Sequence, residues 1–317
     1  MDSRSNNKVD IGFLEEKNSW LLHPKFFPSK VGGKPAWLDL KDLPSPNELH
    51  CNKCNDPMVF LCQIYAPYED THSTAFHRTI FLFVCRNGAC CQTNSSDNFI
   101  VLRCQLPRKN DFYSFEPYEE IETEDFPMDG WPKLCNLCGS KGPSHCSKCK
   151  KTYYCSRKHQ ILDWQKGHKQ IYVNVDEEMD KLRKLMEEKK AGTLSNVSEG
   201  ELEQYTKTIP EDKVFNKFNK TVARHPDQVL RYDRGGQPLW ITGNSGNSIV
   251  NLPVCQYCNG ERQFEFQIMP QLLNFIDVGI ELNSIDWGVL AVYTCKTSCD
   301  QGPAYKNEVV IKQDLSS

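Results

Sequence analysis

The sequence contains no apolar run that approaches the roughly 20 residues needed to cross a membrane as a helix. Its first ten residues, MDSRSNNKVD, contain no apolar core of a secretion signal. There is also no glycine-rich loop of the kind that binds a nucleotide cofactor. These absences predict an intracellular protein with no membrane partner, and they give no support to a nucleotide-dependent enzyme.

Cysteine, by contrast, is abundant, with 16 among 317 residues. In a secreted protein this number would indicate disulfides, but the compartment expected here is reducing, and CxxC pairs then more often bind zinc. With 39% hydrophobic and 25% charged residues, the chain has the composition of a folded globular protein. We therefore expect Zn²⁺ as the cofactor.

An internal repeat divides the chain into two similar halves. GGKPAWL begins at Gly32 and GGQPLWI begins at Gly235, so both copies read GGxPxW followed by an aliphatic residue. CNKCNDPMVFLCQIYAP from Cys51 aligns without a gap to CQYCNGERQFEFQIMPQ from Cys255. FLFVC, which ends at Cys85, is later matched by AVYTC. Three blocks in the same order predict that the halves share one fold and pack together about a pseudo-twofold axis.

Each half offers two pairs of cysteines. A CxxC turn places two sulfurs on one side of a loop, and a second pair completes a tetrahedron about 2.3 Å from a shared zinc ion. Four thiolates leave no position for water, which indicates a structural metal and not a catalytic one. The alternative is that these are free core cysteines. The expected ligand sets are Cys51, Cys54, Cys85 and Cys90 in the first half, and Cys255, Cys258, Cys295 and Cys299 in the second.

Three further cysteines of the first half stand outside these sets. Cys91 is an alternative to Cys90 as the fourth ligand of the first half. Cys62 and Cys104 are unpaired and have no counterpart in the repeat, so we expect them to be buried as apolar side chains.

Short aromatic and β-branched runs lie between the cysteines, among them VFLCQIYAP, TIFLFV, NFIVLRCQL and GVLAVYT. Turn-forming residues bound them, so each half is expected to be mainly β. PQLLNFIDVGIEL from Pro270 has a more helical spacing, but a loop with one helical turn fits equally well. DEEMDKLRKLMEEKKAG from Asp176 predicts a charged, solvated helix.

A cluster of seven metal-binding side chains lies between the halves, in CNLCGSKGPSHCSKCKKTYYCSRKHQILDWQKGHKQIY from Cys135. This segment resembles the MYND zinc finger, including Tyr154, Gln160 and Trp164. The resemblance implies interleaved ligands for two zinc ions. It assigns Cys135, Cys138, Cys155 and His159 to one ion, and Cys146, Cys149 and His168 to the other.

The second finger set departs from the MYND pattern. The resemblance implies a cysteine four residues after His168, yet this position is Tyr172. A weakened or empty site and a substitute fourth ligand both remain open, and His145 lies nearby in sequence. Catalysis at an open zinc position is the third alternative, but no general base or nucleophile accompanies the site.

Charge is segregated along the chain, although the net charge is only −3. The segment 111–129 contains eight acidic residues and no Lys or Arg, whereas 131–171 contains nine Lys and Arg residues and one acid. Such runs can simply be solvated surface. An acidic surface also suits a basic partner.

GGKPAW, CNKC, QLPRKNDFYSFEP, the finger, FEFQIMPQLLNF and SIDWGVLAVYTC follow one another in an order that closely resembles the programmed cell death protein 2 family. The resemblance implies a TYPP-type N-terminal half, a MYND finger and a C-terminal half. It further implies a dedicated chaperone of a newly made small-subunit ribosomal protein, cytoplasmic and nuclear location, and roles in proliferation and cell death. DNA binding is also described for the family.

These observations favour a non-catalytic zinc-binding adaptor or chaperone whose partner is a basic ribosomal protein. A nuclear DNA-binding or chromatin adaptor is the alternative, and it is disfavoured because only the finger is basic. The predicted fold is mainly β with small α content. The expected parts are an N-terminal half at 8–112, an acidic linker at 113–130, the finger at 131–172, a charged helical linker at 173–228 and a C-terminal half at 229–317.

Overall fold

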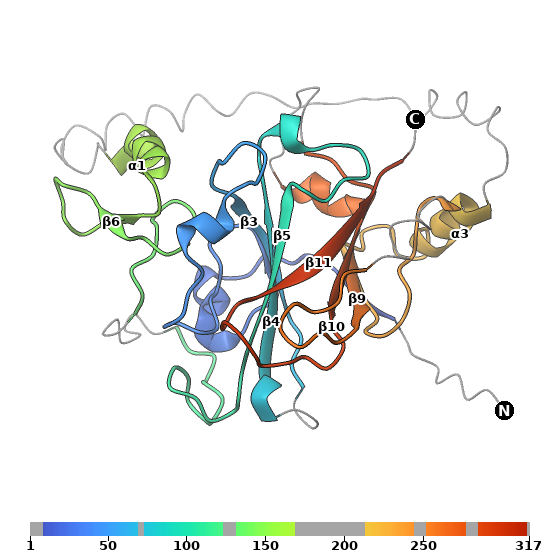
Figure 1. Ribbon diagram of the computed structural model, residues 1–317, viewed down its shortest axis with the longest axis horizontal. Coiled ribbons are helices and arrows are strands. Elements are labelled where there is room, and N and C mark those ends of the chain that lie inside the picture. Colours follow the sequence, from blue (N-terminus) through green and yellow to red (C-terminus); the bar gives the residue numbers. More distant parts are fainter. Residues whose placement is uncertain are drawn as a thin grey trace.

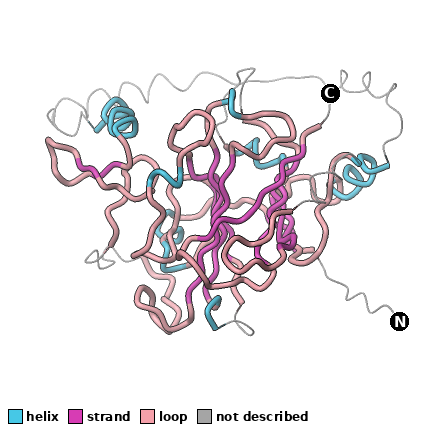
Figure 2. The backbone as a smooth tube through the Cα atoms, viewed as in Figure 1, coloured by secondary structure: helices cyan, strands magenta, loops and turns pink. Residues whose placement is uncertain are grey.

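The computed structural model describes residues 9–68, 73–122, 131–168, 213–243, 252–276 and 285–315. Strands form the centre of the molecule, and long loops and short helices surround them (Figures 1 and 2). The strands are β1 (Asp10–Gly12), β2 (Lys30–Val31), β3 (Val59–Tyr65), β4 (His77–Val84), β5 (Phe99–Leu106), β6 (Ser144–His145), β7 (Tyr153–Tyr154), β8 (Leu230–Tyr232), β9 (Arg262–Ile268), β10 (Val289–Cys295) and β11 (Lys306–Gln313).

The helices are short. Among the described residues, two are α-helical, α1 (Arg157–Asp163) and α3 (Lys213–Val222), and α1 continues into a π-helical turn, η6 (Trp164–His168). The 3-10 helices are η1 (Ser19–Leu22), η2 (Pro24–Phe26), η3 (Pro46–Leu49), η4 (Ser73–Ala75), η5 (Gly88–Cys90) and η9 (Pro270–Phe275). The segment from Pro270 thus begins as a 3-10 helix. In the part of the chain described, no helix is both long and apolar enough to cross a membrane.

Nine strands form a single sheet in the order β1-β8-β9-β10-β11-β5-β4-β3-β2. Apart from β1, the order is symmetric, because β2-β3-β4-β5 of the first half mirrors β8-β9-β10-β11 of the second. The two halves meet where β5 and β11 pair antiparallel, with Leu102 opposite Asn307. This strand order has the pseudo-twofold relation that the repeat predicts.

Two glutamines show the same relation in side-chain detail. The Gln63 side chain accepts a hydrogen bond from the backbone N–H of Ala36 at 2.8 Å. Gln267, its counterpart in the repeat, accepts from the N–H of Leu239 at 2.6 Å. Gln63 also donates to the carbonyl oxygen of Ala36, and Gln267 donates to the carbonyl oxygen of Leu239. Ala36 and Leu239 each precede the tryptophan of GGxPxW, so the repeated motif is attached to its own half in the same way twice.

The fully buried strand β4 shows how the sequence produces the layers. Successive side chains of a strand point to opposite faces. Ile80 and Leu82 therefore enter a core shared by the two halves, whereas Phe81 and Phe83 enter a second core that comes mainly from the N-terminal half, with Tyr305 of the C-terminal half added. This explains why TIFLFV is continuously apolar and not alternating.

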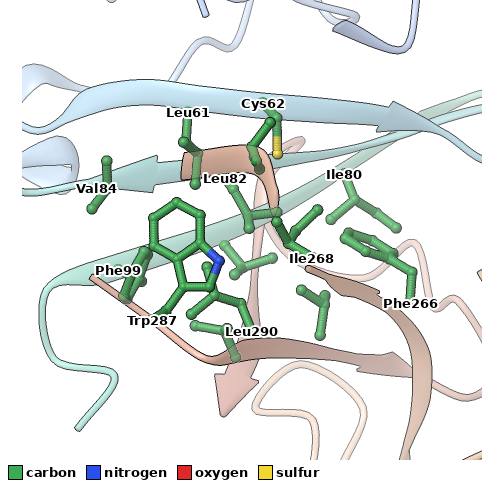
Figure 3. Close-up of a cluster of buried hydrophobic side chains, with 14 of the residues drawn as sticks. Leu61, Cys62, Ile80, Leu82, Val84, Phe99, Phe266, Ile268, Trp287 and Leu290 are labelled. Carbon is green, nitrogen blue, oxygen red and sulfur yellow. The ribbon is translucent and has the colours of Figure 1, made fainter. Parts of the chain in front are cut away.

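The shared core contains side chains from both halves, and Figure 3 shows Leu61, Ile80 and Leu82 facing Ile268 and Trp287. Trp287 is almost fully buried, and its indole N–H donates to the carbonyl oxygen of Met269 at 3.3 Å. A core built from both halves makes their folding interdependent, since neither half can bury this surface alone.

Three contacts cross the boundaries expected from sequence. β1, placed in the N-terminal half, pairs with β8 of the C-terminal half. Within the range assigned to a linker, α3 packs Phe218 and Val222 into the core of the C-terminal half. Tyr113, assigned to the acidic linker, is buried and donates to the carbonyl oxygen of Trp37 at 2.8 Å. The helix expected from Asp176 lies outside the described residues.

Candidate metal centres

The structure brings the expected ligands together in four groups. Within each group, the candidate ligand atoms all lie within 4.8 Å of one another. Three groups have four members and one has three. The groups are Cys51, Cys54, Cys85 and Cys90; Cys255, Cys258, Cys295 and Cys299; Cys135, Cys138, Cys155 and His159; and Cys146, Cys149 and His168.

The sulfur spacing fits zinc. Cys54 and Cys85 have their Sγ atoms 3.6 Å apart, and the same distance separates Cys255 from Cys299. Two thiolates on a tetrahedral zinc ion, each at about 2.3 Å, lie about 3.8 Å from each other, whereas a disulfide requires about 2.05 Å. All sixteen cysteines lie within the described residues, and none forms a disulfide. The donor sets therefore fit Zn²⁺.

Every CxxC turn has the same backbone geometry. In each, the residue four positions after the first cysteine is left-handed and donates its N–H to the carbonyl oxygen of that cysteine. These residues are Asn55, Gly139, Lys150 and Asn259, with φ of 57°, 73°, 59° and 60° and hydrogen bonds of 2.7 to 2.8 Å. Asparagine and glycine tolerate this conformation best. Asn or Gly directly after CxxC is thus a sequence signal for the turn, and only Lys150 departs from it.

Each four-cysteine group of the two halves contains a thiol whose pKa is lowered and one whose pKa is raised, Cys51 beside Cys90 in the first and Cys295 beside Cys299 in the second. Burial raises the pKa of the Cys51 thiol, but hydrogen bonds from the backbone N–H groups of Cys54 and Lys53, together with the side chains of Cys85 and Cys54, bring the pKa down to about 7. Burial also opposes the thiolate of Cys295, yet the N–H of Cys299 helps to lower its pKa to about 6. In contrast, burial raises the pKa of both Cys62 and Cys104 to about 12. These two side chains lie in the apolar cores.

Geometry also distinguishes Cys90 from Cys91. Asn87 caps η5 by accepting from the N–H of Ala89, and this turn directs Cys90 to the first metal group. Cys91 lies elsewhere, with its Sγ 3.4 Å from the carbonyl oxygen of Asp286 and 3.4 Å from Nζ of Lys312. Sequence reasoning could not separate the two neighbours, because the choice depends on the turn.

The first finger group forms around α1. Ser156 caps this helix by accepting from the N–H of His159 at 3.2 Å, directly after Cys155. The cap sets the imidazole so that Nδ1 lies 3.1 Å from Sγ of Cys155 and 3.7 Å from Sγ of Cys135. The seven-residue helix α1 therefore supplies the ligand His159 and holds its imidazole beside the sulfurs of Cys155 and Cys135.

The second finger group contains three ligands. Nε2 of His168, at the end of η6, lies 3.7 Å from Sγ of Cys149. His145 is exposed, packs its ring near Tyr153 and does not belong to the group. Tyr172, which stands where a fourth ligand is expected, lies outside the described residues. The group has the donor types that zinc prefers but lacks one described ligand.

The finger is attached to the N-terminal half through the GGxPxW motif. The indole N–H of Trp37 donates to the carbonyl oxygen of Gly139 at 2.7 Å, in a buried contact. A Cβ on Gly139 would lie 2.7 Å from the side chain of Lys34, and its φ is already positive. Lys158 of α1 forms an ion pair with Asp56 at 2.6 Å. The first CxxC turn of the finger is therefore fitted against the first repeat.

The described acidic side chains of the segment 111–129 are exposed. Glu116, Glu119, Glu120 and Glu122 are all exposed, and so are the large apolar side chains of Phe115 and Ile121. The guanidinium of Arg108 lies over the ring of Phe115, 4.0 Å from its centroid. Residues 115–122, which we call the acidic strip, therefore combine negative charge with apolar side chains at the surface.

Three family models match the sequence. Residues 8–120 match the programmed cell death protein 2 N-terminal domain, residues 212–314 match the C-terminal domain of the same family, and residues 135–171 match the MYND finger. The MYND finger is a zinc-binding module that mediates protein–protein interaction.

Curated relatives extend over nearly the whole chain. "Programmed cell death protein 2" from Bos taurus is 41% identical over 348 residues, covering 100% of this chain and 99% of the relative. "Programmed cell death protein 2-like" from Homo sapiens is 28% identical and covers 86% of this chain and 85% of the relative. "Probable 20S rRNA accumulation protein 4" from Schizosaccharomyces pombe is 22% identical and covers 94% of both. No solved structure matches the chain.

Proposed function

Because this chain belongs to the programmed cell death protein 2 family, we propose that it is a non-catalytic zinc-binding chaperone that holds a newly made, basic protein of the small ribosomal subunit. The proposal includes action in both cytoplasm and nucleus, in support of ribosome production and proliferation. The printed name of the fission yeast relative, which concerns 20S rRNA accumulation, points in the same direction.

The exposed acidic strip is the observation that carries the proposal. A free ribosomal protein is strongly basic, so a carrier needs negative charge to attract it and apolar side chains to hold it. Glu116, Glu119, Glu120 and Glu122 supply the charge, and Phe115 and Ile121 supply the apolar contacts. In the three groups with four members, the metal supports the fold instead of reacting, because a zinc ion with four protein ligands has no position for a substrate.

The experiment is affinity purification of the full chain from cells after a brief translation block, with quantification of each small-subunit protein. One basic protein should be enriched above the rest and should decline as its synthesis stops. Replacing Glu119, Glu120 and Glu122 by Gln should reduce its recovery. The control replaces three exposed acids elsewhere, Glu15, Glu16 and Glu261. Equal recovery from all three versions would contradict a role for the strip.

A DNA-binding adaptor is the second candidate, and the basic charge of the finger favours it. Binding to duplex DNA that weakens steeply with salt, as several phosphate contacts require, would support this alternative. Filter binding of the zinc-loaded chain between 50 and 200 mM salt distinguishes the two functions.

A further inference from the structure

A groove of about 520 Å³ opens between the finger and one end of the sheet. Three parts of the chain line it: the finger, the edge of the N-terminal half and the region around η9. Its lining includes Leu137, Leu162 and Lys166 of the finger, Val59 and Phe60 of β3, and Phe275 of η9. We call this space the finger groove.

The finger groove borders a strand with an open edge. β2 pairs with β3 only at Gln63 and Cys62, and the N–H of Gly32 then donates to the carbonyl oxygen of Leu61 at 2.8 Å. Gly32 and Gly33 are both left-handed, with φ of 67° and 70°, and they turn the chain away from β3. Among the described residues, Val59 and Phe60 therefore have a strand partner only on the β4 side.

An open strand edge beside apolar side chains is a site where an extended peptide can bind. The backbone of such a peptide pairs with the edge, and its alternate side chains enter the apolar groove. Phe275 is 58% exposed where it lines the groove, although burial of a phenylalanine ring is strongly favourable. A bound apolar side chain would cover it.

The charges around the finger groove select the kind of peptide. Among the described residues that line it, three are cations, Arg86, Lys158 and Lys166, against one acid, Asp56, which is already paired with Lys158. The net positive charge disfavours a basic segment and favours a carboxylate. This selectivity is opposite to that of the acidic strip, so the two surfaces suit different partners.

The geometry points to a second binding site: the finger groove takes an extended segment of a partner protein, with apolar side chains at alternate positions and at least one carboxylate. The segment adds to the edge of β3 and places its carboxylate beside Lys166. This site does not depend on the ribosomal client, because its charge preference is the reverse.

Fluorescence polarisation with the zinc-loaded full chain tests the site. The probe is a labelled peptide of sequence TIEIDIET, and the controls are TIKIKIKT, which reverses the charge, and TSESDSET, which removes the apolar side chains. TIEIDIET should bind saturably and at least about tenfold more tightly than either control, a difference that one charge pair or one buried side chain can supply.

Two surface variants locate the binding. Phe275→Ser and Lys166→Glu should each weaken binding of TIEIDIET by roughly five- to tenfold. Val254→Ser removes an apolar side chain of similar exposure, 54%, which does not line the groove, and should leave the affinity unchanged. Hydrogen exchange should slow at one of the two amides of Val59 and Phe60 when the peptide binds, because successive N–H groups of a strand point to opposite edges and only one of these faces away from β4.

Three outcomes would overturn the proposal. The first is an absence of saturable binding, which is also what occupation of the groove by the chain itself would give. The second is equal binding of TIKIKIKT, or an affinity that Phe275→Ser and Lys166→Glu leave unchanged. The third is a dimer in light scattering that Phe275→Ser dissociates, because the groove would then serve a second copy of this chain.

Discussion

Arg78 of β4 and Glu265 of β9 form an ion pair across the two halves, with both side chains fully buried and Nη2 2.8 Å from Oε2. Further groups satisfy the pair: Ser298 accepts from Nε of Arg78 at 2.9 Å, and Tyr232 donates to Glu265 at 3.0 Å. A buried ion pair of this kind adds little net stability, but removing one partner leaves an uncompensated charge. The pair therefore makes correct docking of the halves a condition for folding.

The first prediction concerns this pair. Glu265→Gln should lower the free energy of unfolding by about 3 to 5 kcal/mol, measured by urea denaturation at saturating zinc, because Arg78 stays buried and charged. The double variant Arg78→Met with Glu265→Leu should recover much of the loss. Lys53→Met is the control, since its partner Asp97 is exposed, and it should cost less than about 1 kcal/mol. Equal losses for both single variants would contradict the prediction.

The second prediction concerns acid. Burial opposes the Glu265 carboxylate, but the charge of Arg78 outweighs it and lowers the pKa to about 2. An unfolded glutamate has a pKa of about 4.3. Its contribution to stability is therefore complete above that value and disappears as the pH falls toward 2. Carbon-13 NMR of the Glu265 carboxyl carbon should find the group still ionised near pH 4.

The third prediction concerns His77, which stacks on Phe27 at 4.0 Å and lies 3.0 Å from the hydroxyl of Tyr65. Burial, with a smaller effect of the nearby Arg108 charge, lowers the pKa of His77 to about 4. The neutral imidazole thus favours the folded state above pH 6.5, and this contribution is lost as the pH falls from 6.5 toward 4.

His77→Gln should consequently have a flatter stability profile between pH 7.5 and 5. The expected difference is no more than ~1 kcal/mol per pH unit, because water partly screens the ring. Urea denaturation of the unaltered protein and of His77→Gln at each pH gives the difference in their free energies of unfolding. This difference excludes the effect of zinc loss, because both proteins lose zinc alike. Parallel profiles of stability against pH would contradict the prediction, because they would mean that His77 has the same pKa in the folded and unfolded states.

The fourth prediction concerns attachment of the finger. Trp37→Phe keeps an aromatic ring in the core but removes the hydrogen bond to Gly139, so amide exchange across 131–168 should accelerate several-fold with a loss of about 1 kcal/mol. Trp240→Phe is a control provided by the repeat itself, because Trp240 packs in the core that contains α3. Faster exchange of the finger in the control would mean that the effect is not local.

The fifth prediction is a metal count. Three complete ligand sets should hold zinc tightly, whereas Cys146, Cys149 and His168 should hold it weakly, because a missing thiolate removes both a bond and a balancing charge. Protein purified without added zinc should therefore contain about three equivalents by elemental analysis, and Tyr172→Cys should raise this toward four. Cys91→Ser should change nothing. Four tightly held equivalents in the unaltered chain would indicate a substitute ligand.

Local sequence determined much of this protein. The repeat established two mainly β halves, and CxxC followed by Asn or Gly marked three of the four turns, because a left-handed residue is a local requirement. The order of GGxPxW, the cysteine pairs and the finger was enough to indicate the family. Burial of Cys62 and Cys104 also followed from their lack of partners.

Tertiary structure decided the rest, because these choices depend on contacts between residues far apart in the chain. Pairing of β5 with β11 joins the halves into one sheet, and β1 crosses to β8 since strand edges accept any partner of suitable register. The choice of Cys90 over Cys91 depends on the capped turn of η5. The finger is attached to the first repeat by the hydrogen bond from Trp37 to Gly139, and the finger groove is lined by both parts. Both features therefore depend on contacts between the finger and the first repeat. Shape complementarity of this kind has no periodic or spacing signature in a single sequence.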